Sequence, residues 1–254
     1  MWGTASGTIL ADIVIDGHGV LGSGIAARQP EGLAIQRVVA SNFRSWGIFV
    51  DADDFDRTVG EPPLLEDLNV ANVSRPVPRS SDGTAEACIW VGNTAVGRRF
   101  KVRNCAWMGV WSGTAAKHAR FSDIDIDDIG SREGSSTGLY LEPFTTDSVF
   151  ERIRIGPNVT VGIVCEWADP AWGSRPACDG VVIQDSLIDS RCVGAYLDDG
   201  TRNTTLRRTA FVHQASAAVA IFNKHYNILY DTSGNDYGLM QAGAPVVLNK
   251  NNPC

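Results

Sequence analysis

The chain of 254 residues lacks any apolar run long enough to cross a membrane, since no stretch approaches the ~18 residues that a spanning helix needs. It also lacks an excess of basic residues, because 22 lysines and arginines stand against 29 aspartates and glutamates, a net charge of −7. Binding to a phosphate backbone requires a basic face. We therefore expect neither a membrane nor a nucleic acid among its partners.

The N-terminus lacks the basic start and apolar segment of a secretory signal. We nevertheless expect an extracellular, cell-surface or virion location, with export directed by something outside this sequence. Cysteine is sparse, and the sequence alone leaves the pairing of the six open. They are Cys88, Cys105, Cys165, Cys178, Cys192 and Cys254. Cys165 falls on an inward strand position, so we expect it to be buried as a small apolar side chain.

Helical windows with a 3.6-residue apolar period are missing too, which argues against a doubly wound α/β fold. What the chain has instead is one short strand pattern that recurs at intervals of 20 to 41 residues. Its eight copies are 47–51 (GIFVD), 88–92 (CIWVG), 109–113 (GVWSG), 138–142 (GLYLE), 162–166 (GIVCE), 194–198 (GAYLD), 218–222 (AVAIF) and 238–242 (GLMQA). Self-similarity at such periods indicates a solenoid.

Each repeat also carries an earlier strand with alternating apolar and polar residues, such as IQRVVAS, FSDIDIDDI or FERIRIG. A turn residue recurs between the two strands, and we expect these side chains to stack as a ladder, because Asn and Asp tolerate left-handed turns. The turn residues are Asn42, Asn104, Asn158 and Asp189. This organisation resembles the single-stranded right-handed parallel β-helix of the pectin-lyase-like superfamily, and the resemblance covers nearly the whole chain.

The resemblance implies an all-β solenoid of about nine coils in one domain over residues 1–254, whose inward side chains form continuous columns. Ile48 and Val50 begin two such columns, and Leu139 and Leu141 continue them. No amphipathic helix precedes the first strand, so we expect a β-helix without an N-terminal cap, as in a piece of a larger assembly. Such a protein would be a monomer or a trimer.

A given position recurs every ~4.8 Å in a parallel stack, so each column is a line of side chains on the surface. The outward middle column reads Phe49, Trp90, Trp111, Tyr140, Val164, Tyr196, Ala220 and Met240. Exposed aromatic faces pack against the C–H faces of sugar rings, so this line predicts a binding site for a polysaccharide or oligosaccharide. The alternative is that flat side chains stack on neighbouring strands and only stabilise the sheet.

The last position of each short strand reads Asp51, Gly92, Gly113, Glu142, Glu166, Asp198, Phe222 and Ala242. Two glycines would clear space beside Trp90 and Trp111, and three carboxylates follow on consecutive coils. Glu142 and Glu166 would lie ~5 Å apart, near the spacing of a retaining glycosidase pair. We expect Glu142, Glu166 and Asp198 to be catalytic acids and bases. The alternatives are a calcium site, as in the pectate lyases of the superfamily, or ordinary turn residues.

Four long insertions, 51–63, 74–86, 130–138 and 167–179, are predicted to wall the aromatic groove. Trp167, Trp172 and Arg175 would overhang it, and Asp51 would lie at its edge. The full set of expected substrate-binding residues is Trp90, Trp111, Tyr140, Phe49, Tyr196, Trp167, Trp172, Arg175 and Asp51.

Three functions are compatible with these features. The preferred one is a glycoside hydrolase that needs no cofactor, and for this function we name no residue as a metal ligand. The second is a lyase or epimerase of uronic-acid polymers that uses calcium, with Lys224, His225 or Arg175 as the base. The third is a non-catalytic polysaccharide-binding β-helix, such as a phage tail-fibre segment, because one scaffold serves many functions.

Overall fold

A computed structural model of the chain shows an all-β protein. It describes residues 7–28, 31–51, 60–73, 87–92, 94–113, 116–130, 136–166, 176–198, 200–221, 230–231, 236–239 and 244–248. Every regular element within these ranges is a strand. Accordingly, the described residues contain no helix of the length and apolarity that a membrane span requires.

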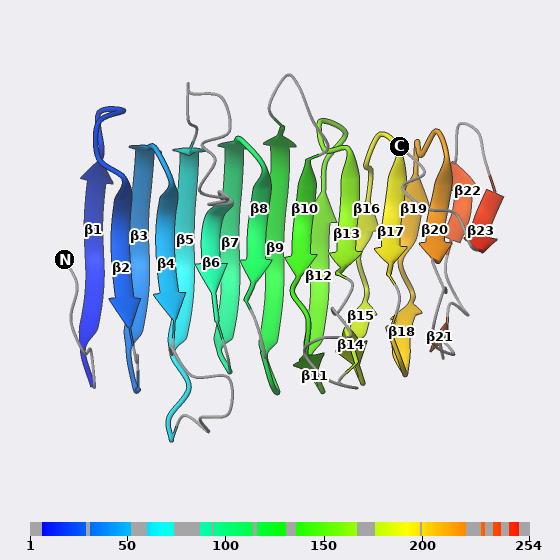
Figure 1. Cartoon of the computed structure of the whole chain (residues 1–254). Helices are drawn as coiled ribbons and strands as arrows, with labels where there is room; N and C mark the ends of the chain where they lie inside the picture. Colours follow the sequence, from blue (N-terminus) through cyan, green and yellow to red (C-terminus); the bar gives the residue numbers. More distant parts are fainter. Residues whose placement is uncertain are drawn as a thin grey trace.

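The chain passes alternately through two long parallel sheets, A and B, as Figure 1 shows. The strands of sheet A are, in order, β2 (Ser23–Arg28), β4 (Trp46–Asp51), β6 (Ala87–Val91), β8 (Met108–Ser112), β10 (Thr137–Leu141), β13 (Val161–Cys165), β17 (Val193–Leu197), β20 (Ala217–Ile221) and β23 (Ala244–Leu248). This alternation is the arrangement of a β-solenoid, so the prediction of an all-β fold with long parallel sheets is confirmed.

Sheet B has longer strands in its first half and broken ones in its second half. Its main path is β1 (Ile9–Asp16), β3 (Ala34–Phe43), β5 (Leu64–Val73), β7 (Val96–Cys105), β9 (Arg120–Ile129), β12 (Val149–Ile155), β15 (Val182–Gln184), β18 (Thr204–Arg207) and β21 (Tyr230–Asp231). Beside this path lie β16 (Leu187–Ile188), β19 (Ala210–Val212) and β22 (Asp236–Leu239). A small third sheet joins β11 (Thr145–Thr146) to β14 (Cys178–Asp179).

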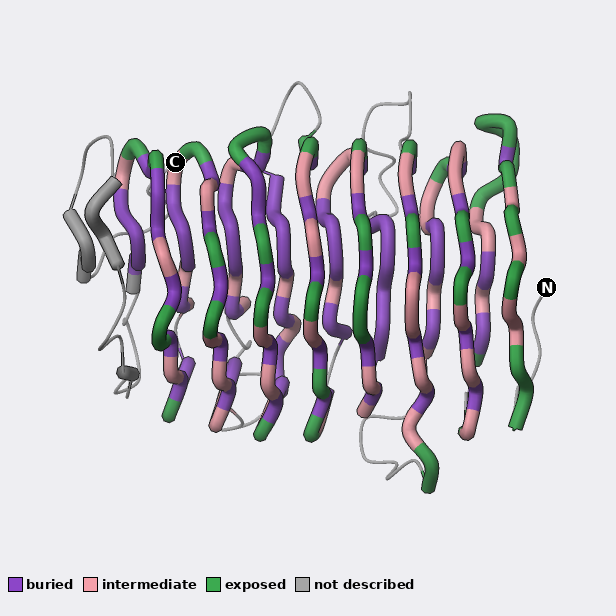
Figure 2. The backbone as a smooth tube through the Cα atoms, turned by 180° about the vertical axis from the view of Figure 1, so that it is seen from behind, coloured by how far each residue is buried: buried purple, intermediate pink, exposed green. Residues whose placement is uncertain are grey.

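The core lies between sheets A and B and consists of the predicted inward columns. Ile48, Val50, Leu139 and Leu141 are all fully buried, which confirms their assignment. Aromatic rings extend the core along the axis, because Phe121 stacks on the ring of the next coil, Phe150, at 5.5 Å between centroids. Figure 2 shows buried positions alternating with exposed ones along the strands of sheet B, the pattern expected when one face of a strand meets the core.

Seven of the eight predicted short strands lie in sheet A, and the eighth prediction is wrong. Instead of forming a strand over 238–242, the chain forms β22, which pairs with β19 in sheet B. The strand of sheet A that follows β20 is β23, where Val247 pairs with Ala220 in the outward column. Met240, which the sequence assigned to this column, lies outside the described residues. A four-residue apolar alternation suits either sheet, which explains the error. The sequence also missed β2, whose Ala26 pairs with Phe49.

An asparagine ladder forms at one bend of the coil, as predicted, but with different members. Asn72 Nδ2 donates to Asn42 Oδ1 at 3.1 Å, and Asn104 Nδ2 donates to Asn72 Oδ1 at 2.8 Å. All three residues have left-handed backbones, with φ of 56° to 62° for the first two and 52° for Asn104. No described side-chain hydrogen bond connects Asn158 or Asp189 to this ladder. Asp189 instead lies 2.7 Å from the Nδ1 atom of His213.

A second left-handed position bends each strand of sheet B, and here aspartate alternates with arginine. The column has φ between 48° and 59° and consists of Asp12, Arg37, Asp67, Arg99, Asp123, Arg152, Asp185 and Arg208. Each arginine pairs with the aspartate one coil earlier, as in Arg152 Nε to Asp123 Oδ1 at 2.7 Å. The sequence analysis did not identify this column.

The cysteines divide into bonded and free pairs. Cys88 and Cys105 form a disulfide with a Cα–Cα separation of 5.7 Å, and Cys192 is also disulfide-bonded. Cys165 and Cys178 are free and buried, which confirms the prediction for Cys165.

Candidate functional site

The outer face of sheet A carries the predicted aromatic column in register. Phe49 pairs with Trp90, Trp90 with Trp111, and Trp111 with Tyr140. Val164 then separates Tyr140 from Tyr196. The column therefore runs along the molecule as the sequence predicted, because parallel pairing keeps equivalent positions in line.

The rings pack on each other more than the sequence suggested. Phe49 stacks on Trp90 with centroids 4.5 Å apart, and Tyr140 meets Trp111 edge-on at 5.1 Å. Trp46, which the sequence analysis missed, adds a further contact with Trp111 at 5.9 Å. Trp46 lies at the first outward position of β4, one residue before the repeat that was recognised. This aromatic cluster is an outer apolar layer on sheet A.

Trp90 is 9% exposed, so the expectation of an exposed indole at this position is wrong. Its ring occupies the space that the glycines leave, since a Cβ built on Gly92 would come within 2.6 Å of it and one on Gly113 within 2.3 Å. The two glycines therefore make room for the Trp90 ring and do not leave open space beside it.

The predicted carboxylates follow on consecutive coils at the ends of the short strands. The backbone N–H of Glu142 donates to Ser112 O at 3.0 Å, that of Glu166 to Leu141 O at 2.9 Å, and that of Asp198 to Cys165 O at 3.0 Å. These bonds place the three residues at equivalent positions of neighbouring strands, which are about 4.8 Å apart.

The three carboxylates all act on Tyr140 electrostatically. Tyr140 donates a hydrogen bond to the Glu166 carboxylate, and the charges of Glu142 and Asp198 also act on it. Burial, followed by the charge of Glu166, raises the pKa of Tyr140 far above its usual range. Tyr140 therefore stays protonated and serves Glu166 as a hydrogen-bond donor.

Glu166 is the partly buried member of the three carboxyl groups that accepts the hydrogen bond of Tyr140. Burial raises the pKa of Glu166 above its usual value, the hydrogen bond from Tyr140 opposes this, and the neighbouring Glu142 and Asp198 raise it further. Such a carboxyl group holds its proton at a higher pH than an exposed one.

A cavity of about 250 Å³ opens beside these groups on sheet A. Its lining combines aromatic and apolar side chains with two carboxylates, and comprises Trp107, Met108, Thr137, Tyr140, Val161, Val164, Glu166, Val193, Tyr196 and Asp198. The structure thus brings Tyr140, Tyr196, Glu166 and Asp198 together around one space. The sequence analysis missed Trp107 and Met108, although they directly precede the recognised repeat.

Other predicted residues lie elsewhere. Asp51 belongs to β4, and its Oδ1 would be 2.8 Å from a Cβ built on Gly92, so it lies beside Trp90 and not at the cavity. Trp167, Trp172, Arg175, Lys224 and His225 lie outside the described residues. No group of three His, Cys, Asp or Glu side chains suited to a metal ion occurs in the part of the chain that the structure describes.

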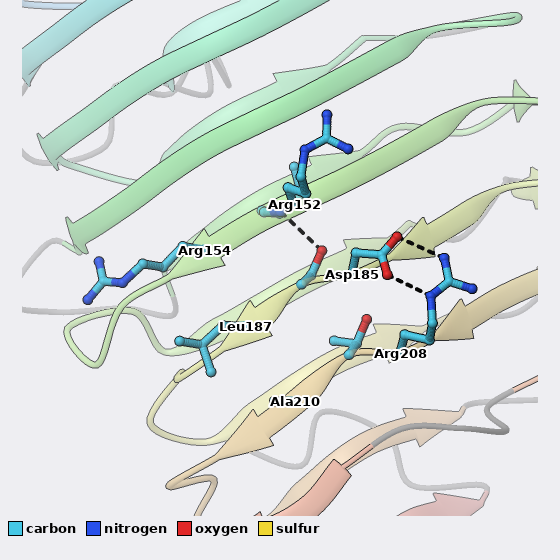
Figure 3. A pocket seen from close by; sticks show the side chains of 9 residues that line it. Arg152, Arg154, Asp185, Leu187, Arg208 and Ala210 are labelled. Atoms are coloured by element: carbon cyan, nitrogen blue, oxygen red, sulfur yellow. Dashed lines mark hydrogen bonds and ion pairs between the residues drawn. The ribbon is translucent and has the colours of Figure 1, made fainter.

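A second, more open depression of about 600 Å³ lies on sheet B, and Figure 3 shows Arg152, Arg154, Leu187 and Arg208 among the residues that line it. Its arginines are already ion-paired within the sheet. Arg208 Nε lies 2.6 Å from Asp185 Oδ1, and Arg154 Nη1 lies 2.9 Å from Asp125 Oδ1. We therefore assign this surface to the stabilisation of the strands.

No protein-family model, no curated protein and no solved structure matches this chain.

Proposed function

We propose that this protein is a carbohydrate-active enzyme that hydrolyses a polysaccharide or oligosaccharide bound along the outer face of sheet A. The supporting observation is one cavity lined by two carboxylates, Glu166 and Asp198, together with the aromatic rings of Trp107, Tyr140 and Tyr196. On this proposal the scaffold is a right-handed parallel β-helix of about nine coils, of the pectin-lyase-like kind. A carbohydrate ring needs both features, namely an apolar wall for its C–H face and polar groups at its edge.

Glu166 is the proposed general acid. A glycosidic oxygen must receive a proton as the bond breaks, and a carboxyl group with a raised pKa still carries that proton near neutral pH. The pKa of Glu166 is shifted in the direction that this role requires, because burial favours its neutral form. Tyr140 would hold the Glu166 carboxyl group in place through its hydrogen bond.

Asp198, which also lines the cavity, is the proposed nucleophile. Residues on neighbouring coils are separated by about 4.8 Å, which is close to the roughly 5 to 5.5 Å between the carboxyl groups of retaining glycosidases. Glu142 flanks Glu166 on the other side. The two carboxylates together favour the protonated form of Glu166.

The aromatic cluster would carry the sugar residues beyond the cavity. Tyr140 and Tyr196 line the cavity itself, and Trp111 and Phe49 continue the column away from it. Trp90 would support Phe49 from below rather than touch the ligand, because it is buried. Trp167, Trp172, Arg175 and Asp51 would complete the binding surface as the sequence suggests.

A non-catalytic, polysaccharide-binding β-helix is the second candidate. The observation in its favour is that the aromatic rings contact each other edge-to-face and face-to-face, so they also stabilise the sheet without a ligand.

The test is a panel of neutral and acidic polysaccharides, assayed for new reducing ends and for unsaturated products, with and without a chelator. The hydrolase proposal expects new reducing ends, no unsaturated products and no effect of the chelator. Glu166→Gln and Asp198→Asn should each reduce the rate by about 100-fold or more, since acid–base catalysis contributes that much. Glu31→Gln, at an exposed position between β2 and β3, is the matched control and should leave the rate unchanged.

The pH dependence distinguishes the role of Glu166 further. Hydrolysis should decline as the pH rises through the raised pKa of Glu166, because the acid then loses its proton. Full activity in both Glu166→Gln and Asp198→Asn would refute the catalytic assignment. Unsaturated products that a chelator abolishes would instead indicate the calcium-dependent lyase, and binding without turnover would indicate the non-catalytic protein.

A further inference from the structure

Two free cysteines, Cys165 and Cys178, lie side by side in the core next to the candidate site. Both are buried, and the Cys178 thiol neighbours that of Cys165. Cys165 ends β13, immediately before Glu166, and Cys178 begins β14. The residues 166–177 connect the two cysteines.

The strand register identifies the residues of the neighbouring coils that are equivalent to Cys165 and Cys178. Cys165 pairs with Leu141 on one side and Leu197 on the other. Cys178 pairs with Thr145 on one side, and the N–H of Arg202 bonds to its carbonyl oxygen at 2.7 Å on the other. The equivalent positions are therefore Leu141 with Thr145 in the preceding coil, and Leu197 with Thr201 in the following one.

In both neighbouring coils a tight turn joins these positions. In each coil, three residues separate the two positions in the sequence, 142–144 and 198–200. Each turn is closed by a threonine, because Thr145 Oγ1 donates to Glu142 O at 2.8 Å and Thr201 Oγ1 donates to Asp198 O at 2.8 Å. A turn of this length brings the residues that flank it close together, within the range that a disulfide can bridge.

In the coil with the cysteines, 12 residues, 166–177, separate these two positions in the sequence instead of three. The stacked register nevertheless keeps Cys165 and Cys178 at the two positions that the tight turn joins in the adjacent coils. Cys165 and Cys178 therefore occupy the positions that Leu141 and Thr145 hold in the preceding coil. Unlike that pair, the two cysteines can form a disulfide.

We propose that Cys165 and Cys178 form a disulfide that links the two ends of the segment 166–177 and restrains the backbone of Glu166, which directly follows Cys165. The oxidant is a small-molecule disulfide such as oxidised glutathione. One cysteine thiolate attacks a glutathione sulfur and releases one reduced glutathione, and the second cysteine then attacks the mixed disulfide and releases another. The two cysteines lose two electrons and two protons, which the two glutathione molecules take up.

The bond forms during folding, before the core closes. In the folded protein, burial raises the pKa of the Cys178 thiol well above its usual value, so little of the reactive thiolate is present. The chain also contains the disulfide Cys88–Cys105, which the same exchange with glutathione would form. This inference does not depend on the proposed hydrolase activity.

The test is to refold the reduced, unfolded chain in a buffer of reduced and oxidised glutathione, and in parallel with reductant alone. Remaining thiols are alkylated, and the unreduced digest is mapped by mass spectrometry. The expected result in the glutathione buffer is a cross-linked peptide pair containing Cys165 and Cys178, lighter by two hydrogen atoms than the separate peptides. The amide of Glu166, which donates to Leu141 O, should exchange about tenfold more slowly in the oxidised protein, because the disulfide suppresses local opening.

Cys165→Ser and Cys178→Ser are the control variants. Each should leave its former partner open to alkylation or to a mixed disulfide with glutathione. The proposal is overturned if the wild-type chain refolds with the Cys88–Cys105 disulfide formed while Cys165 and Cys178 both stay reduced and are recovered as alkylated cysteines. It is also overturned if the cross-link forms but the exchange of Glu166 does not change, because the backbone of Glu166 would then be restrained without it.

Discussion

Ser112 is a polar side chain in an otherwise apolar column of the core. It lies between Val91 and Leu141 in the register of sheet A, is fully buried, and its Oγ makes no hydrogen bond in the part of the chain that is described. A buried hydroxyl without a partner has given up its hydrogen bonds to water without forming others, which lowers the stability of the folded state. We expect Ser112→Ala to stabilise the protein by about 1 kcal/mol, measured by urea unfolding.

Ser148 provides the matched control, because it is equally buried but its hydroxyl is used. Ser148 Oγ donates to Thr146 O at 2.8 Å and accepts from the N–H of Ala119 at 3.1 Å. Ser148→Ala should therefore destabilise the protein by about 1 to 3 kcal/mol, since it leaves a buried amide unpaired. Equal effects of the two substitutions would contradict this account of Ser112.

For single residues, the sequence predicted backbone positions well and side-chain directions poorly. The periodicity placed Trp90 in the correct column, yet its indole turned over Gly92 and Gly113, where it is buried. Tyr140 and Glu166 were predicted as a sugar-stacking residue and a separate acid. Their hydrogen bond could not be predicted, because it depends on the rotamers of two side chains on adjacent coils.

At the scale of the strand, the alternating Asp–Arg column explains how sheet B bends without losing its register. The residue pairs on either side stay matched, as in Ser122 with Glu151 and Ile124 with Ile153, while the left-handed residues between them point outward and pair. A left-handed backbone disfavours β-branched side chains, whereas Asp and Asn tolerate it. The ion pairs add a smaller contribution, since they are partly exposed.

Asp123 allows the two contributions to be separated. Asp123→Asn keeps a side chain that suits φ of 57° and removes only the charge, so it should cost less than about 1 kcal/mol. Asp123→Val should cost about 1 to 2 kcal/mol more, because the β-branched residue strains the backbone. Urea unfolding at low and high salt measures both. The loss of unfolding free energy in Asp123→Asn should become smaller at high salt. The additional loss in Asp123→Val should not depend on salt. Equal losses of unfolding free energy in the two variants would exclude the backbone effect.

The sequence contains a pattern that marks this Asp–Arg column. In IQRVVA, LEDLNV, FSDIDI and FERIRI a charged residue occupies the third position, directly before an inward apolar residue. A simple alternation of apolar and polar residues does not explain it, because Ile35 and Val38 both point inward although three positions separate them. That irregular spacing is what a left-handed bend produces, whereas strict strand periodicity assumes an even one.

For the whole molecule, the repeat predicted the parallel solenoid because every coil has the same inward columns. It failed toward the C-terminal end, where 238–242 was assigned to sheet A and β22 instead pairs with β19. Stacking supplies the restraint on register, so a short segment with few neighbours can be assigned to either sheet by its pattern alone. Where several coils agreed, as from β4 to β17, the predicted register is confirmed.

A solenoid in which each coil contacts only its neighbours should also respond locally to damage. Phe121 of β9 is the central test, because it is buried, stacks on Phe150 and meets Phe100 edge-on at 6.0 Å. Phe121→Ala should reduce the unfolding free energy by about 3 to 5 kcal/mol. Amide exchange should accelerate most in β7, β9 and β12, which are in direct contact, and least in β1 and β3. Uniform acceleration across all strands would mean that the molecule unfolds as one cooperative unit, and that the energetics are not those of a stack of coils.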